Sequence, residues 1–147
     1  MYQRILVTTD GTKLSKKAVG HALELAKLCG CQLVALKVVP RYPQSYFEGG
    51  IALAAEDISR IEAHWAHEGQ MVVDAIAKLG AKKGVQVKPL TVRGDVVSDA
   101  VLATVDKLGC DLVIMASHGR RGIKRLLLGS ETQQVLTHSE VPVLVLK

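Results

Sequence analysis

The chain alternates between short apolar segments rich in β-branched residues and longer segments in which apolar residues recur at helical spacing. Parallel strands that are covered by helices on both faces are expected to be almost uninterrupted in apolar residues, because neither face meets water. The predicted strands are 5–7, 33–39, 85–92, 112–116 and 141–146. Because helices must return the chain to the same end of such a sheet, the alternation predicts an α/β fold with right-handed crossovers.

The segments between these strands have the periodicity of amphipathic helices. Apolar residues of 18–26 share one helical face, and those of 97–108 repeat in the same way. A longer helix is predicted over 51–83, and a further helix begins near Ser130. The segment 41–50, RYPQSYFEGG, precedes the long helix and is the predicted place for a lid or a disordered stretch. The expected element order is β-α-β-α-β-α-β-α-β.

Length and composition limit the class of protein. A chain of 147 residues fits one domain, which we predict over 1–147. Aromatic residues make up only 3%, so Val, Leu, Ile and Ala must fill the core. No apolar run approaches the roughly 18 to 20 residues that cross a bilayer, and the opening residues have no signal-peptide pattern. We therefore expect a cytoplasmic protein with no membrane partner.

The three cysteines, Cys29, Cys31 and Cys110, form an odd set. The sequence Cys29-Gly30-Cys31 is neither a CxxC redox pair nor half of a convincing zinc site. We predict three buried or half-buried thiols, which is the usual state of free cysteine.

The formal net charge of +5 permits attraction to nucleic acid or to anionic surfaces. Much of the excess comes from lysines and arginines that are equally consistent with solvated helix and loop surfaces. Nucleic acid is therefore not an expected partner.

A glycine-rich segment follows the predicted strand 112–116 and precedes the last predicted helix. It contains Gly119, Gly122 and Gly129. Ser130 and Gln133 have the spacing of a capping box, which predicts Ser130 as the helix N-cap. Free backbone N–H groups and the positive helix end would then lie beside glycines that let an anion such as phosphate come close. The alternative is an ordinary strand-to-helix loop that needs its glycines only for positive φ.

Other glycine-rich motifs fit this chain less well. The Walker pattern GxxxxGK[ST] is absent and no GxGxxG follows the first strand, so neither a P-loop NTPase nor a dinucleotide-binding fold is supported. The segment 119–122, GRRG, imitates the GXXG clamp of KH domains. That clamp belongs to an RNA-binding module of different topology, and here a strand precedes it.

Asp10 directly follows the first predicted strand. In an open parallel sheet, ligands bind outside the carboxyl ends of the strands where the winding direction reverses, so the ends of strands one and four should meet there. Asp10 and the Gly119 loop would then line one cleft. The carboxylate can accept hydrogen bonds from a ribose or base, or help to hold Mg²⁺; its alternative role is to cap the first helix or to fix the turn.

The predicted fold is a single-domain, Rossmann-like open sheet of five mainly parallel strands in the order 3-2-1-4-5, with four helices distributed over both faces. The whole chain resembles the universal stress protein family, most specifically in its opening RILVTTDGT and its closing ASHGRRGIKRLLLGSETQQVLTHSEVPVLVLK. ATP-binding members of that family carry the pattern Gly-x2-Gly-x9-Gly-[Ser/Thr]. The pattern falls here on Ala116, Gly119, Gly129 and Ser130. Ala116 thus replaces the first glycine, and its methyl group either crowds a ligand or is accepted where φ is negative.

The resemblance implies an ATP site, with Mg²⁺ carried on the phosphates, and a homodimer. The residues implied at the adenosine are Thr8, Thr9, Asp10 and Val38, with Met115 and Ala116 at the end of the fourth strand. The residues implied at the phosphates are Gly119, Arg120, Gly129, Ser130, Glu131 and Thr132. The dimer would form along the last strand, 141–146, since an apolar edge strand is an aggregation hazard unless it is paired.

Candidate catalytic residues are few. His118 lies in the glycine-rich loop without a visible carboxylate partner, and His64 with His67 would need further ligands to bind a metal. The leading hypothesis is a non-enzymatic, ATP-binding dimeric regulator of a stress response, with at most slow ATP hydrolysis. The alternatives are a dimeric interaction protein that binds no nucleotide and a weak ATPase of the same fold.

Overall fold

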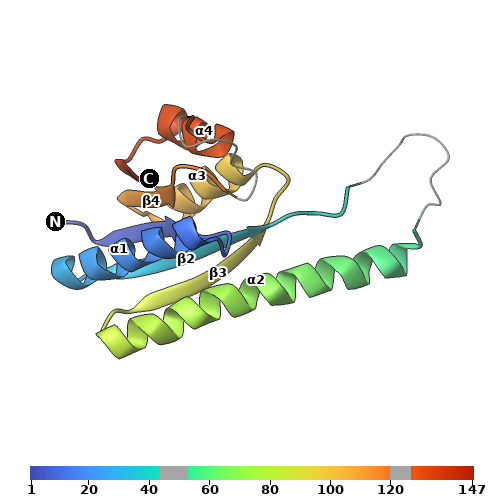
Figure 1. Cartoon of the computed structure of the whole chain (residues 1–147), viewed down its shortest axis with the longest axis horizontal. Coiled ribbons are helices and arrows are strands. Elements are labelled where there is room, and N and C mark those ends of the chain that lie inside the picture. Colours follow the sequence, from blue (N-terminus) through green and yellow to red (C-terminus); the bar gives the residue numbers. More distant parts are fainter. Residues whose placement is uncertain (44–52, 120–126) are drawn as a thin grey trace.

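The computed structural model describes residues 1–43, 53–119 and 127–147, which form an open parallel sheet between two layers of helices (Figure 1). The strands are β1 (Arg4–Thr8), β2 (Gln32–Val39), β3 (Val87–Arg93), β4 (Leu112–Ala116) and β5 (Val143–Leu146). The helices are α1 (Lys13–Cys29), α2 (Ala55–Lys83), α3 (Val97–Leu108) and α4 (Ser130–His138). All strand pairs are parallel and their order is β3-β2-β1-β4-β5. The predicted fold and strand order are confirmed.

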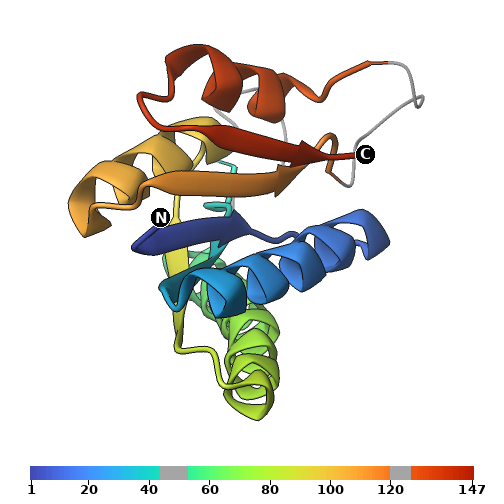
Figure 2. The ribbon, with the colours of Figure 1, turned by 90° about the vertical axis from the view of Figure 1, so that its left-hand side faces the viewer.

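The two faces of the sheet bury two separate apolar cores. In β1, Ile5 and Val7 pack with residues of α1 and α2, whereas Leu6 packs with residues of α3 and α4. All three side chains are fully buried. Figure 2 shows the corresponding layers, with α1 and α2 on one side of the strands and α3 and α4 on the other. This two-sided burial is the physical reason for the apolar runs in the sequence.

Some predicted boundaries are wrong by a few residues, mostly at the edges of the sheet. Val85 is buried but precedes β3, because α2 ends at Gly84 (φ 75°) and the Val85 N–H donates to the Gly80 carbonyl at 2.9 Å. Val141 precedes β5, since its N–H donates to Oγ of Ser139 at 3.2 Å. The long helix begins at Ala55 rather than at residue 51. Most of the segment predicted as a lid lies outside the described residues.

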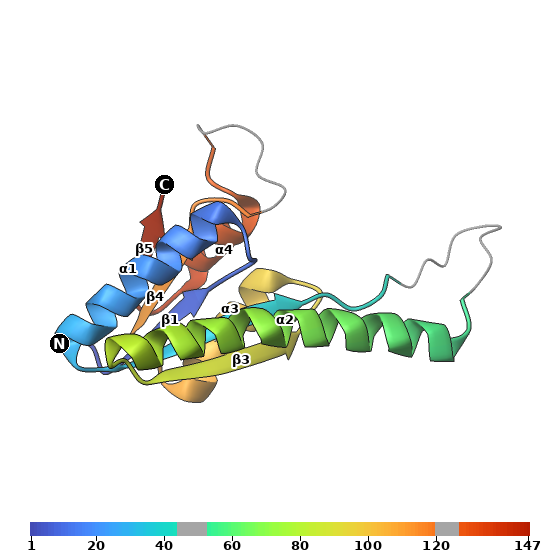
Figure 3. The ribbon, with the colours of Figure 1, turned by 60° about the horizontal axis from the view of Figure 1, so that its bottom comes forward.

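Helix α2 runs along β3 and continues past the end of the sheet (Figure 3). Two buried glycines allow its close approach. A Cβ built on Gly69 would lie 2.9 Å from Cγ2 of Val39, and one built on Gly80 would clash with Cγ2 of Val87. Near the exposed half of the helix, Trp65 stacks on Tyr42 with ring centroids 6.2 Å apart. Of the described helices, none is both long and apolar enough to cross a membrane.

Two helical glycines provide a matched test of this packing. Gly20 lies on the exposed face of α1, and nothing lies within 4 Å of a Cβ built there. We expect Gly80→Ala to lower the free energy of unfolding by about 1–3 kcal/mol through overpacking against β3. Gly20→Ala should raise it by about 0.5–1 kcal/mol through helix propensity alone. Denaturant titration measures both, and a stabilised Gly80→Ala variant would contradict the packing argument.

Candidate functional site

The loops that follow β1 and β4 leave the sheet side by side, at the point where its winding direction reverses. A Cβ built on Gly119 would lie only 3.0 Å from Oδ2 of Asp10, so these two residues are neighbours although 109 positions separate them. We call the surrounding residues the strand-end site: 8–12, Val38, 115–119 and 129–132. Their position matches the place where ligands bind in open α/β sheets.

Asp10 uses its two carboxylate oxygens differently. Oδ1 accepts hydrogen bonds from the Thr12 amide (2.9 Å) and hydroxyl (2.6 Å), which fixes the turn into α1. Burial raises the pKa of Asp10, but the bonds from Thr12, a bond from Ser15 and the charge of Lys37 outweigh it, so the pKa falls below its ordinary value of 3.8. Asp10 is therefore ionised at neutral pH, with Oδ2 next to Gly119. The cap of α1 is Thr12, whose side chain accepts from the Ser15 amide.

Helix α4 begins at Ser130 with Gly129 as its N-cap, so the prediction of Ser130 as N-cap is wrong by one residue. The Gly129 N–H donates to the Ser117 carbonyl at 2.7 Å, and the Gly129 carbonyl accepts from the Gln133 amide at 2.9 Å. This contact fixes the turn one position earlier than the capping-box spacing indicates. Because glycine has no side chain, the N-cap residue itself makes no side-chain hydrogen bond to the first turn of α4.

The two described glycines of this loop, Gly119 and Gly129, serve close approach rather than positive φ. The described glycines with positive φ are Gly11, Gly30, Gly84 and Gly109. Gly129 has an ordinary φ of −59°, but a Cβ there would lie 3.1 Å from the Ser117 carbonyl oxygen and 3.2 Å from Cα of His118. Glycine is thus required at position 129 by the close approach of the backbone of residues 117 and 118. At position 119 the near neighbour is instead the carboxylate of Asp10. Gly122 lies outside the described residues.

Two side chains in the first turn of α4 hold that helix in place. Glu131 Oε2 accepts a hydrogen bond from the Ser98 amide at 2.6 Å and so caps the N-terminus of α3, whose own N-cap Val96 has no suitable side chain. Thr132 donates through Oγ1 to the Ala116 carbonyl at 2.9 Å and is 3% exposed. The sequence reasoning missed the Glu131–Ser98 contact. The one feature of the sequence that indicates this contact is Val96, which precedes helix 97–108 and cannot cap it.

The residues predicted at the adenosine divide into buried and half-exposed groups. Thr9 is buried, and its hydroxyl lies 3.3 Å from Oγ of Ser15. Met115 is buried in the core against α3 and α4. Thr8 and Val38 are half-buried at the carboxyl ends of β1 and β2. Asp10 and Ala116 are half-buried as well, so these four residues, and not Thr9 or Met115, keep exposed surface at the strand-end site.

Ala116, the departure from the family pattern, is the last residue of β4 and pairs with Leu146 of β5. Extended strand backbone has negative φ, which alanine adopts without strain. The methyl group therefore requires no change in the backbone. Arg120, predicted at the phosphates, lies outside the described residues.

Ser117 connects several parts of the site and was not singled out by the sequence. Its N–H donates to the Leu146 carbonyl at 2.8 Å, and its carbonyl accepts from Gly129. Its Oγ lies 3.1 Å from Nδ1 of His118. Within the described residues, no group of three or more His, Cys, Asp or Glu side chains converges as a metal site.

Comparisons with known proteins agree over the full chain. A sequence profile described as the universal stress protein family matches residues 1–147. Universal stress protein MJ0531 of Methanocaldococcus jannaschii is 30% identical over 147 residues, which cover 100% of this chain and 83% of that protein. The solved structure of protein MJ0577, from the same organism, superposes with a TM-score of 0.86 at 27% identity, covering 100% of this chain and 96% of that one.

Two further solved structures with this fold are described as nucleotide complexes. A universal stress protein in complex with cAMP superposes with a TM-score of 0.71 at 24% identity, covering 99% of this chain and 97% of that one. The universal stress protein of Archaeoglobus fulgidus in complex with dAMP gives a TM-score of 0.66 at 19% identity, covering 99% and 98%.

The Glu131–Ser98 contact predicts an effect on the stability of α3. Glu131→Ala removes the cap of α3 and should lower the free energy of unfolding by about 0.5–2 kcal/mol. Gln134→Ala, at an exposed position of the same helix, is the control and should stay within about 0.5 kcal/mol of the parent. Denaturant titration gives the values, and amide exchange at the start of α3 locates the loss. Equal stabilities of the two variants would refute the capping role.

Proposed function

The chain belongs to the universal stress protein family, and we propose that it is a member that binds ATP with Mg²⁺ at the strand-end site and acts as a dimeric, non-enzymatic regulator of a stress response. The observation that carries the proposal is the N-terminus of α4, whose N-cap residue Gly129 has no side chain and bonds through its N–H to Ser117 at the end of β4. Gly119 and Asp10 lie at the end of the same strand pair.

The phosphates are assigned to the first turn of α4. Its amides form the positive end of a helix, and the N-cap glycine supplies no side-chain acceptor for them, which favours an anion. The hydroxyl of Ser130 is at an exposed position and adds a donor, whereas Glu131 and Thr132 contribute only their amides, because their side chains are bonded elsewhere. Gly119 is exposed and leaves room for a phosphate that any side chain would fill. Arg120 stays a predicted phosphate contact.

Asp10 is assigned to the ribose or to Mg²⁺ rather than to a phosphate. Its lowered pKa keeps it negatively charged at neutral pH, so it repels a bare phosphate but accepts hydrogen bonds from ribose hydroxyls. Mg²⁺ prefers one or two carboxylates together with phosphate oxygens, and Oδ2 faces the loop of Gly119. When bound, Mg²⁺ neutralises phosphate charge next to this carboxylate.

The base is assigned to the half-buried surface of Thr8 and Val38. An apolar side chain and a hydroxyl at the strand ends suit a planar heterocycle with polar edges. Met115 is buried in the same apolar cluster against which Val38 packs. The two neighbouring structures described with cAMP and dAMP both hold an adenine nucleotide, which supports adenine as the base. The strain-free backbone at Ala116 supports binding despite the departure from the family pattern.

The geometry favours binding over turnover. Nδ1 of His118 lies 3.1 Å from Oγ of Ser117, and among the described residues no bond to a carboxylate orients this imidazole as a base. Oδ1 of Asp10 already accepts two hydrogen bonds from Thr12. A regulator needs only to bind the nucleotide, and the amides of α4, the Ser130 hydroxyl and the Asp10 carboxylate are groups that can bind it.

Calorimetric titration with ATP and Mg²⁺ tests the nucleotide site. The parent should bind below millimolar ATP, and Gly119→Val should weaken binding at least about tenfold, because a branched side chain would contact Asp10 and fill the ligand space. Gly20→Ala, an exposed glycine far from the site, is the matched control and should bind like the parent. Absence of heat at millimolar ATP refutes the proposal, and phosphate release well above that of Asp10→Ala identifies an ATPase instead.

The dimer is proposed along β5, which is an edge strand of the described sheet. Leu144 is 42% exposed on this strand, whereas Val143 and Val145 pack against the core. We expect light scattering after size exclusion to give twice the chain mass. Leu144→Lys should shift the protein toward monomer, since it places a charge in the apolar contact, while Leu28→Lys, at an exposed position of α1, should leave the mass unchanged. A parent that stays monomeric at high micromolar concentration would exclude this dimer.

A further inference from the structure

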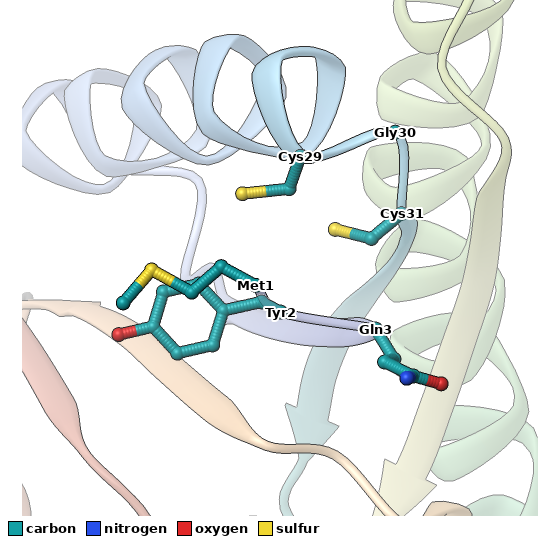
Figure 4. Close-up of a pocket in the computed structure, with 6 residues that line it drawn as sticks. All are labelled: Met1, Tyr2, Gln3, Cys29, Gly30 and Cys31. Carbon is teal, nitrogen blue, oxygen red and sulfur yellow. The ribbon is translucent and has the colours of Figure 1, made fainter.

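Two cysteines share a pocket at the end of the sheet opposite to the strand-end site. The pocket has a volume of about 310 Å³ and is lined by Met1, Tyr2, Gln3, Cys29, Gly30 and Cys31. Figure 4 shows the sulfur atoms of Cys29 and Cys31 turned into the same space, with Met1 and Tyr2 on the facing wall. Both thiols are half-buried, while Cys110 is buried, as predicted from the sequence.

The backbone holds the two thiols on either side of a tight turn. Cys29 is the last residue of α1, and Cys31 directly precedes β2. Between them Gly30 adopts the left-handed conformation (φ 63°, ψ 32°), and the Cys31 N–H donates to the Ala26 carbonyl at 3.0 Å. A helix end, a strand start and this hydrogen bond fix the pair, so little ordering is required when a ligand engages both sulfurs.

The electrostatics of the pocket disfavour free thiolates. Both thiols are half-buried, and burial disfavours a charged sulfur. The pair also lies at the C-terminal, negative end of α1. Reactive and redox-active cysteines have lowered pKa values, so this environment argues against a nucleophilic or redox role. The thiolate is the metal ligand, so a soft metal ion that binds both sulfurs must displace their two protons to solvent.

We propose that Cys29 and Cys31 bind one thiophilic monovalent metal ion, Cu(I), as a pair of thiolates. Sulfur ligands select soft ions such as Cu(I) over Mg²⁺ or Ca²⁺, which require oxygen. Structural zinc sites use four ligands, and the described residues supply no group of three or more His, Cys, Asp or Glu there. Cu(I) differs because two thiolates satisfy it in a linear arrangement. The thioether of Met1, in the wall of the pocket, is a further soft donor.

Competition with a chromophoric Cu(I) chelator tests the site. The reduced, full chain is titrated anaerobically into Cu(I) held by bathocuproine disulfonate, and loss of the complex's absorbance measures transfer. We expect one Cu(I) per chain. Cys29→Ala and Cys31→Ala should each weaken binding by more than about 100-fold, because even the loss of outer-shell partners costs 10- to 100-fold. Cys110→Ala is the matched control and should bind like the parent, since its thiol lies in the core between the sheet and α3.

A second readout on the parent protein keeps the test valid if a cysteine variant fails to fold. Cu(I) should protect Cys29 and Cys31 from iodoacetamide in the native chain, as measured by peptide mass spectrometry. The proposal is overturned if the parent takes no copper from the chelator, if either single variant binds like the parent, or if both thiols alkylate equally fast with and without copper. None of these outcomes depends on nucleotide binding.

Discussion

The parallel pairing of β1 with β4 is the interaction on which the site depends. It aligns Ile5 with Leu112 and Val7 with Ile114, so that chain segments more than one hundred residues apart end at the same edge. Two hydrogen bonds stabilise the pair where both strands begin: the Asp111 carboxylate accepts them from the backbone amides of Gln3 (2.8 Å) and Arg4 (3.1 Å). Without this register, Asp10 and Gly119 would not meet, and no reversal of winding would lie between them.

Around this pairing, several polar side chains of the strand-end site form hydrogen bonds that hold the fold together. The side chains of Glu131 and Thr132 form hydrogen bonds with α3 and β4, and Oδ1 of Asp10 accepts one in the turn into α1. The groups left facing the strand-end site are chiefly helix amides, one carboxylate oxygen and glycine surface. Helix amides and glycine surface favour an anion through charge and close approach rather than through a specific side chain.

The sequence was sufficient for the fold because the inner strands are buried on both faces. Leu33 to Leu36 are fully buried, so the apolar run alone marks β2. At β3 and β5 the exposure is mixed, and there the apolar runs began before the strands did. The site was less accessible to sequence reasoning. Local spacing indicated the wrong N-cap for α4, since the Gly129–Ser117 contact that decides it joins residues 12 positions apart. The Glu131–Ser98 hydrogen bond joins residues 33 positions apart, and such a contact produces no periodic pattern in the sequence.

The hydrogen bond from Ser117 to Leu146 joins the glycine-rich loop to the last residue of β5. The start of the glycine-rich loop thus continues the hydrogen-bonded pairing of β4 with the edge strand β5, in which Ala116 and Leu146 are in register. For a chain that both binds a ligand at that loop and self-associates along that edge, thermodynamic linkage makes any coupling between the two events reciprocal. Whatever factor the ligand applies to the association constant, association applies to the affinity for the ligand. A change in protein concentration would then change the fraction of chains that hold ligand, just as a change in ligand concentration would change the fraction of chains that are associated.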